Sequence, residues 1–239
     1  MRWTEVSANP NLPELLNLRA SCLDKARRRP IGDRIDYLCD LARGKRVLDV
    51  GVVNHIVVEV KDPNWLHGRL AAVTDYCLGI DVVADGIREL REKGFNVAVC
   101  DITSSLQQIV SESFNLIICG EIIEHLGNPA AVFEAAARLL APSGRLVVTT
   151  PNPFYLGRVI RHLFNAPREN VDHVTMMFPS GIAELADRAG LALTEYRGVY
   201  PQPLTAKRKL LLPMKWMVQA AMNDEAVCES LIYECTRST

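Results

Sequence analysis

Two glutamates and a histidine stand close together in one short stretch, as Glu121, Glu124 and His125. If that stretch forms a helix, residues three and four apart fall on one side, so the three side chains point the same way. Two carboxylates and an imidazole suit a hard or borderline divalent cation, Mg²⁺ among them. A second histidine, His173, could complete the ligand set. The spacing therefore predicts a metal site made of Glu121, Glu124, His125 and His173.

The same two histidines are candidates for acid-base chemistry. Histidine titrates near neutral pH, so His125 and His173 are suited to removing a proton from a substrate, and we predict them as catalytic residues. The chain has no nucleophile elbow of the Ser-His-Asp type, no P-loop and no zinc-finger spacing. Of the other histidines, His55 and His67 lie near a predicted turn and are expected to shape it, and His162 is expected at the surface.

Three apolar runs along the chain each end in an aspartate, at Asp49, Asp81 and Asp101. Such runs predict buried parallel strands, and ligands bind at the carboxyl ends of parallel strands. Asp81, after the second strand, is placed to accept two hydrogen bonds from ribose hydroxyls. Any one of these acids could instead lie at a helix N-terminus, where the helix dipole stabilises it. Three acids at successive strand ends favour a ligand site over that alternative.

Strand and helix patterns alternate from residue 44 onward, after two predicted N-terminal helices. That alternation predicts an α/β fold in which a doubly wound, mostly parallel seven-stranded sheet carries helices on both faces. We assign residues 1–43 to an N-terminal helical cap and residues 44–239 to the main domain. Insertions at about 151–176 and 198–228 are expected to form the substrate side. The predicted strands are 46–50, 76–80, 95–100, 114–119, 145–150, 191–197 and 231–235.

The first strand ends in a single glycine, Gly51, followed by Val52, Val53, Asn54 and His55. A turn without further glycines has less access to positive φ and holds its backbone further from a ligand. Nicotinamide binding requires a G-x-G-x-x-G turn, so this chain does not favour that cofactor. The span to the second strand is long, and we hypothesise that the longer loop restores access to a ligand by another path.

The segment RVLDVG, ending at Gly51, closely resembles the first motif of class I S-adenosylmethionine (SAM) dependent methyltransferases, usually VLDVGCGxG. The later glycines of that motif are absent here. LGID resembles the second motif of the family, and FNLIICGEIIEHL with LLAPSGRLVVTTPNP resembles the fourth and fifth segments. The resemblance covers about residues 44–197 and implies a Rossmann-like methyltransferase fold with SAM as the cofactor.

The resemblance also implies roles for individual residues. Asp49 would meet the methionine amine of SAM, Asp81 the ribose, and Asp101 the adenine amino group, with the Ile102 backbone beside it. An arrangement of Glu-x-x-Glu-His with a distant histidine binds a metal in some O-methyltransferases of this fold, including RNA 2′-O-methyltransferases and quinone-precursor O-methyltransferases. Other members carry the same letters without a metal, so Mg²⁺ or another divalent cation stays one of two alternatives. The residues implied for cofactor binding are Asp49, Gly51, Asp81, Val82, Asp101, Ile102, Cys119 and Glu121.

Composition narrows the class of protein. The formal net charge of −1 leaves no global electrostatic attraction for nucleic acid. The seven cysteines are scattered without a CxxC pair, which predicts reduced, mostly buried thiols in a cytoplasmic protein. We expect no signal peptide and no transmembrane segment, since no apolar run approaches about 18 residues. A homodimer is left open.

We predict a SAM-dependent methyltransferase that acts on an oxygen of a small molecule or a saccharide. The saccharide rests on a likeness between residues 52–66, with Trp65-Leu66-His67, and methyltransferases of bacterial glycan pathways. One alternative is a non-catalytic protein that kept the fold as a binding or scaffold domain, and another is an RNA methyltransferase, which the near-neutral charge disfavours. For the basic and apolar segment 204–219 we expect a helix packed on the core, a lid over the substrate, or a basic surface for an acidic partner or membrane.

Overall fold

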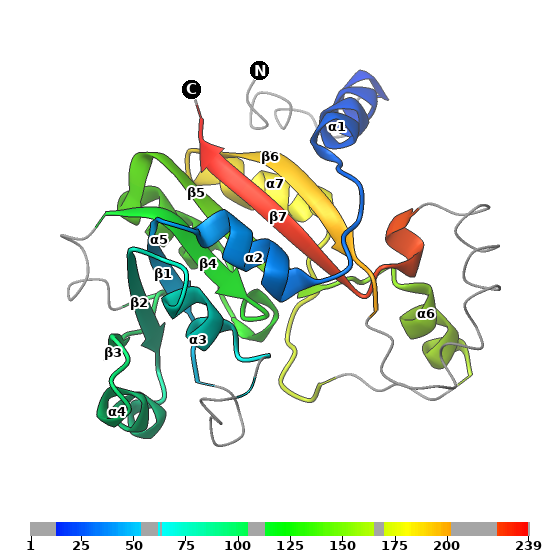
Figure 1. Ribbon diagram of the computed structural model, residues 1–239. Helices are drawn as coiled ribbons and strands as arrows, with labels where there is room; N and C mark the ends of the chain where they lie inside the picture. The colour runs from blue at the N-terminus through cyan, green and yellow to red at the C-terminus, as the bar shows by residue number, and fades with distance from the viewer. Residues whose placement is uncertain are drawn as a thin grey trace.

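One seven-stranded sheet runs through the molecule in the order β3-β2-β1-β4-β5-β7-β6 (Figure 1). The computed structural model describes residues 13–53, 62, 64–104, 113–164, 170–201 and 224–238. Neighbouring strands are parallel except that β7 is antiparallel to β5 and β6, so the predicted α/β class and doubly wound, mostly parallel sheet are confirmed. The strands are β1 (Arg46–Val50), β2 (Tyr76–Asp81), β3 (Val97–Val99), β4 (Phe114–Gly120), β5 (Leu140–Pro151), β6 (Leu191–Val199) and β7 (Ser230–Arg237).

Helices cover both faces of the sheet. α2 and α3 lie on one face, α5 and α7 lie on the other, and α4 packs beside β3 at one edge (Figure 1). α6 packs against η4, which lies just before the start of β7. The α-helices are α1 (Pro13–Ala26), α2 (Arg34–Ala42), α3 (Leu66–Ala71), α4 (Ala84–Glu92), α5 (Ala130–Leu139), α6 (Leu156–Leu163) and α7 (Pro179–Arg188), and the short 3-10 helices are η3 (Ile123–His125) and η4 (Asp224–Val227).

Two helix predictions were wrong in detail. The sequence pattern predicts a helix over 65–76, but α3 ends at Ala71, because β-branched residues follow and the chain already bonds to the carbonyl of Lys45 as it enters β2. The sequence also predicts a helix over 85–93 with Asp85 as its N-cap and Gly94 as its stop, yet α4 begins at Ala84 without a side-chain cap, since Asp81 already accepts the N–H of Val83. The predicted helix stop at Gly94 is confirmed by its φ of 88°. A helix is also predicted over 103–110, but only residues 103 and 104 of it are described, and they lie in a turn. Positions 54–55 and the segment 204–219 lie outside the described residues.

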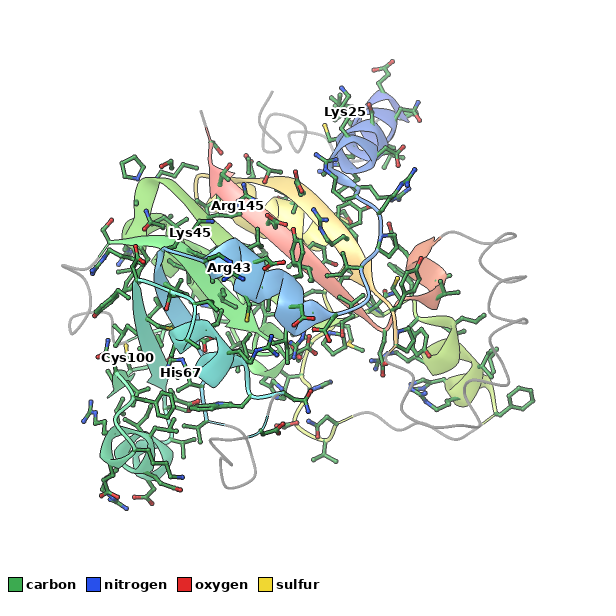
Figure 2. All side chains as sticks on the ribbon, in the orientation of Figure 1. Lys25, Arg43, Lys45, His67, Cys100 and Arg145 are labelled. Atoms are coloured by element: carbon green, nitrogen blue, oxygen red, sulfur yellow. The ribbon has the colours of Figure 1, made fainter. Side chains whose placement is uncertain are left out.

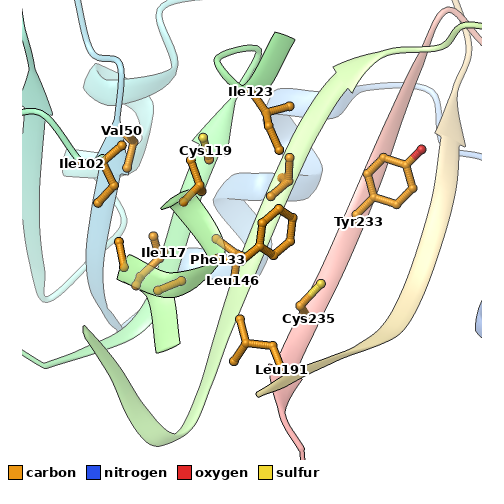
Figure 3. Packing of buried hydrophobic residues seen from close by; sticks show 14 of the residues in the cluster. Val50, Ile102, Ile117, Cys119, Ile123, Phe133, Leu146, Leu191, Tyr233 and Cys235 are labelled. Atoms are coloured by element: carbon orange, nitrogen blue, oxygen red, sulfur yellow. The ribbon is translucent and has the colours of Figure 1, made fainter. Parts of the chain in front are cut away.

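The larger apolar cluster fills the face under α5 and α7. Its largest completely buried side chains are Phe114, Tyr196, Phe133 and Tyr233, of which Figure 3 shows Phe133 and Tyr233. Burying one such side chain contributes roughly 1.5–3 kcal/mol, so the contacts on this face stabilise the sheet substantially. A second cluster on the opposite face ties α2 and α3 to β1, β4 and β7, so the central strands β1 and β4 bury apolar residues on both faces.

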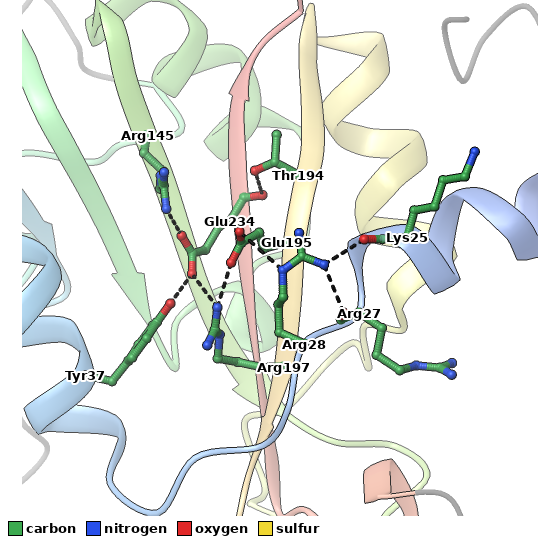
Figure 4. Close-up of polar contacts among 9 residues, drawn as sticks. All are labelled: Lys25, Arg27, Arg28, Tyr37, Arg145, Thr194, Glu195, Arg197 and Glu234. Carbon is green, nitrogen blue, oxygen red and sulfur yellow. Dashed lines mark hydrogen bonds and ion pairs between the residues drawn. The ribbon is translucent and has the colours of Figure 1, made fainter.

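Polar contacts add to the attachment of α2. Tyr37 of α2 donates its hydroxyl to the carboxylate of Glu234, which lies completely buried on β7 (Figure 4). The same carboxylate pairs with Arg145 of β5 and lies 3.7 Å from the guanidinium of Arg197 of β6. Burial raises the pKa of the Tyr37 hydroxyl, so that this group stays protonated and donates. The first turn of α2 is thereby fixed relative to the central strands.

Candidate active site

A cleft of about 810 Å³ lies along the carboxyl ends of β1, β2 and β4. β1 and β4 are neighbours where the strand order reverses, which is where open α/β sheets bind ligands. Figure 2 shows His67, on α3, and Cys100, after β3, at this end of the molecule, and both line the cleft. The described residues that line it are Arg34 and those in 49–53, 64–67, 80–83, 100–102, 120–122, 124–126, 170 and 172–173.

The turn after β1 folds back onto the end of β2. The carboxylate of Asp81 accepts the backbone N–H of Val53 at 2.9 Å and that of Val83 at 3.0 Å. Val52 is buried, and its carbonyl accepts the indole N–H of Trp65 at 3.0 Å. The first residues of the long loop therefore lie against the acid that was expected to hold a ribose.

Glycines in the facing elements make room for the valines of this turn. A Cβ at Gly79 of β2 would lie 2.8 Å from Val52 Cγ1, and a Cβ at Gly86 of α4 would lie 2.5 Å from Val53 Cγ1. Both distances are too short for carbon atoms, so only glycine fits at these two positions beside a valine turn.

Gly51 is held by contact with the turn after β4. It has a φ of 82°, in the region that favours glycine. A Cβ there would lie 2.1 Å from Cδ1 of Ile122, which leaves no space for a side chain. The turns after β1 and β4 are therefore packed directly against each other.

The acid at the end of β1, Asp49, is buried and receives a hydrogen bond from a histidine. Nδ1 of His67 lies 3.0 Å from Oδ2 of Asp49. Val82, which is exposed, and Ile102, which is buried, also line the cleft. Cys119 was also predicted to meet the cofactor, but it is completely buried in the apolar core and is not among the described residues that line the cleft.

Asp101 follows β3 and binds the residues just after it. Its carboxylate accepts the backbone N–H and the hydroxyl of Thr103, at 2.8 and 2.7 Å, and the hydroxyl of Ser104 at 2.8 Å. The hydrogen bonds from Thr103 outweigh burial and lower the pKa of Asp101, so this acid is charged at neutral pH. Asp101 therefore lines the cleft and also stabilises the turn at 101–104 through its hydrogen bonds with Thr103 and Ser104.

Glu121, after β4, lies in strained backbone and pairs with α2. Its φ is 55°, which is uncommon for a residue other than glycine and tends to occur at functional sites. Its carboxylate accepts the hydroxyl of Thr149 at 3.0 Å and lies 3.2 Å from the guanidinium of Arg34. Arg34 also donates to Thr149 at 2.9 Å, which fixes its guanidinium at the edge of the cleft.

Glu124 is the buried acid of the site. Its Oε2 accepts the hydroxyl of Thr150 at 2.9 Å, and its Oε1 is buried without a hydrogen-bond partner among the described residues. Burial, together with the nearby Glu121 carboxylate, raises the pKa of Glu124 to about 7. Near neutral pH this carboxyl group is therefore present in both its protonated and its ionised form.

His125 and His173 meet beside Glu124. Their ring centroids are 4.7 Å apart with the rings nearly perpendicular, and one ligand atom from each of the three residues lies within 4.8 Å of the others. Nδ1 of His125 lies 3.1 Å from Oδ2 of Asp172. The carbonyl of Glu124 accepts the N–H of Val174 at 2.8 Å, which fixes the segment that carries His173 against η3. Burial, and then His125, lower the pKa of His173, so it is neutral at neutral pH.

Comparison with known proteins identifies the family. A family model described as a methyltransferase domain matches residues 23–196. The chain belongs to this methyltransferase family. Its sheet, with one antiparallel strand and a cleft at the reversal of strand order, is that of the class I SAM-dependent enzymes, so the predicted family is confirmed.

Curated relatives of this methyltransferase include enzymes named ubiquinone biosynthesis O-methyltransferase. The one from Pseudomonas fluorescens is 30% identical over 199 residues, which cover 80% of this chain and 83% of that protein. The one from Aeromonas salmonicida is 27% identical over 187 residues, which cover 74% and 76%.

Solved structures show the same fold at low identity. A SAM-dependent methyltransferase from Archaeoglobus fulgidus has a TM-score of 0.57 and 14% identity, over 84% of this chain and 89% of that one. Magnesium protoporphyrin IX methyltransferase from Synechocystis, solved with bound S-adenosylhomocysteine (SAH), has a TM-score of 0.57 and 14% identity, over 99% and 93%. In the part of this methyltransferase that the structure describes, no helix has the length and apolar character needed to cross a membrane.

The structure gathers most of the predicted residues of the methyltransferase around one cleft. Glu124, His125 and His173 come together as a cluster, whereas the Glu121 carboxylate is engaged with Arg34, outside that cluster. Residues that sequence reasoning missed are Arg34, Thr149, Thr150 and Asp172. Asp172 could have been found from the sequence, because it directly precedes the predicted site residue His173. The position of Arg34 depends instead on contacts between segments that are distant in sequence.

Proposed function

We propose that this methyltransferase transfers the methyl group of SAM to a hydroxyl oxygen of a small molecule or a saccharide. The observation that carries the proposal is the cluster of Glu124, His125 and His173 at the wall of the cleft, since an acceptor hydroxyl needs a group that takes its proton. Relatives named as O-methyltransferases support oxygen as the acceptor atom.

The acids at the strand ends give SAM an orientation in this proposal. Asp81 holds the ribose: its oxygens already accept two backbone N–H groups, yet a carboxylate offers about four lone-pair sites, so ribose hydroxyls can still bond. Asp101 and Ile102 receive the adenine. Asp49 meets the ammonium of the methionine end, and Arg34, the one described cleft-lining residue with a permanent positive charge, meets its carboxylate.

Methyl transfer is an in-line displacement, so the acceptor oxygen must lie opposite the sulfur that leaves. His173 is neutral at neutral pH because its pKa is lowered, and it is therefore able to accept the hydroxyl proton. Asp172 lies 3.1 Å from Nδ1 of His125 and orients that ring at the wall of the cleft. Glu124, with a pKa of about 7, is a second acceptor of that proton.

The same three residues fit a divalent cation. Oε1 of Glu124 and Nδ1 of His173 are both buried without a hydrogen-bond partner among the described residues, which is costly unless a ligand satisfies them. One carboxylate and two imidazoles suit Mn²⁺, Fe²⁺ or Zn²⁺ as well as Mg²⁺. Glu121 would join the set only by releasing Arg34. When bound, the ion would supply a Lewis acid that favours the deprotonated acceptor hydroxyl.

The proposal is tested with labelled SAM, the metal-stripped protein and a panel of phenols, catechols and oligosaccharides. We expect transfer to oxygen, loss of activity after chelation and its return with Mn²⁺ or Mg²⁺. Transfer only to nitrogen would contradict the proposal that the acceptor atom is oxygen. Full activity after chelation would rule out a role for the metal but would be compatible with a histidine as the base. Strongly salt-dependent methylation of RNA would favour the RNA alternative instead.

Cofactor binding is tested separately by calorimetry with SAM and SAH. We expect binding by the native protein and a loss of at least about 10-fold in affinity on Asp81→Ala, because the ribose hydroxyls lose a charged acceptor. No binding at millimolar SAM would favour the non-catalytic alternative, for which the contact of Val53 with Asp81 is the structural argument.

A further inference from the structure

His67 is completely buried at the base of the cleft, and it is not part of the cluster of Glu124, His125 and His173. Its side chain is 1% exposed and the side chain of Asp49 is 4% exposed, and the two form a pair at 3.0 Å. Among the described residues, only His67 forms a hydrogen bond with the Asp49 carboxylate. Both residues line the cleft, so the pair lies at the methionine end of the proposed SAM site.

The surroundings of the His67 ring are mostly apolar, and among the described residues Asp49 is its one strong hydrogen-bond partner. The ring packs against the rings of Trp65 and Phe95, at centroid distances of 5.6 and 5.8 Å, and those two rings also contact each other. A Cβ on Gly79 would lie 2.6 Å from Cε1 of His67, so the ring occupies the space that the glycine leaves. Sγ of Cys77 lies 3.9 Å from the same Nδ1 that faces Asp49, a distance that adds only a weak contact.

Nε2 of His67 is buried without a partner among the described residues. A buried polar atom left unpaired costs about 1–3 kcal/mol, which an apolar side chain of similar size would avoid. The contact that opposes this cost is the hydrogen bond from Nδ1–H to the charged carboxylate of Asp49, since bonds to charged groups are the stronger kind. The histidine is thus favoured at this position by Asp49 and not by packing.

The turn after β1 makes this support necessary. The carbonyl of Val52 and the N–H of Val53 are directed to Trp65 and Asp81, away from Asp49. Trp65, directly before α3, and His67, within α3, therefore donate the hydrogen bonds that hold the turn and the acid before it.

We propose that His67 is a positioning residue for cofactor binding. It donates to Oδ2 of Asp49 and fixes the carboxylate so that its other oxygen receives the ammonium of the methionine end of SAM. The inference rests on the proposed placement of SAM, and it assigns His67 a role through Asp49, without contact to the reacting atoms.

The test compares two probes, SAH, which carries the amino-acid end, and 5′-methylthioadenosine, which lacks it. For His67→Phe, which keeps a ring and removes the donor, we expect SAH affinity to fall at least about 10-fold. Affinity for methylthioadenosine should stay within about 2-fold, because that probe has no ammonium. His67→Asn, whose amide can donate from nearly the position of Nδ1, should recover most of the SAH affinity.

The matched control is Phe95→Leu, which disturbs the packing of the same ring without touching the pair. It should lower the melting temperature and leave the ratio of the two affinities unchanged. An equal loss of both probes in His67→Phe would mean a structural role only and overturn the inference. Unchanged SAH affinity in Asp49→Asn would instead refute the placement of SAM, whereas a loss there with none in His67→Phe would refute His67 alone.

Discussion

Two buried glutamates in this molecule, Glu234 and Glu124, differ in how completely their carboxylates are hydrogen-bonded. Glu234, on β7, is completely buried and both of its oxygens have partners, with Tyr37, Arg145 and Arg197 around it (Figure 4). Glu124, on η3, is equally buried, but Thr150 satisfies only one of its oxygens. The first carboxylate joins α2 to three strands, and the second faces the cleft.

The difference separates an acid that stabilises the fold from one that is kept for a ligand. A buried charge is tolerated when cations and donors surround it, as at Glu234. Glu124 lies near a second carboxylate, Glu121, so burial and repulsion raise its pKa to about 7. An incompletely paired acid that titrates near neutrality marks the site of chemistry better than burial alone does.

The largest effect is expected on activity from Glu124→Gln. The variant keeps the shape and the bond to Thr150 but removes the carboxylate, so methyl transfer should fall about 1,000-fold, within the usual range for a lost acid-base group. Initial rates at saturating SAM provide the measurement. A decrease of less than about 3-fold would place Glu124 outside the chemistry and end the comparison.

The next largest effect is expected on stability from Glu234→Gln. Removing this charge leaves the guanidinium of Arg197, which is mostly buried, without its deepest partner. We expect the free energy of unfolding to fall by about 2–4 kcal/mol, while methyl transfer per folded molecule stays within about 2-fold. Chemical denaturation gives the first number and an active-site titration the second. Activity lost without stability would reverse the roles of the two acids.

The pH dependence of stability should separate native protein and Glu124→Gln. The pKa of Glu124 is near 7 in the folded state, above the value near 4.5 of an unfolded glutamate, so folding takes up a proton in between. Metal-free native protein should therefore lose about 3 kcal/mol relative to the variant as pH rises from 4.5 to 7. His173, whose lowered pKa gives the opposite slope, is present in both proteins and cancels. Parallel denaturation curves across this range would disprove the shift.

The smallest effect is expected from Asp172→Asn. The amide can still accept from Nδ1–H of His125 but carries no charge, so the ring is held less firmly. We expect a loss of about 10-fold in rate with SAM affinity unchanged, as for other residues that orient a functional histidine. Weaker SAM binding in this variant would assign Asp172 to the cofactor side.

The strands and the acids at their ends were predictable because each depends on a local pattern. Runs such as RVLD and LGID mark a buried strand and its end without reference to the rest of the chain. The approach of Arg34 to Glu121, and of Asp172 to His125, depends on pairing between segments far apart in sequence. No local spacing encodes such contacts, so these partners had to come from the structure.

The spacing of Glu121, Glu124 and His125 was informative for a reason different from the expected one. The segment is not one helix: Glu121 has a positive φ and only 123–125 form η3. The strained residue turns its carboxylate toward Arg34 and lets the next two functional side chains meet His173. Sequence spacing indicated the right residues, but the backbone geometry that divides them was not visible in it.

The glycines that face the turn after β1 have a consequence for which residues can change during evolution. Gly86 supplies the space that Val53 fills, so these two residues are expected to change together, whereas Gly79 makes room for His67 and Val97 as well as for Val52. A descendant that regained a glycine-rich turn would be free to enlarge residue 86, but residue 79 would stay a glycine as long as His67 and Val97 remain in place. Paired substitution at residues 53 and 86 is therefore the historical signature to seek among homologous chains.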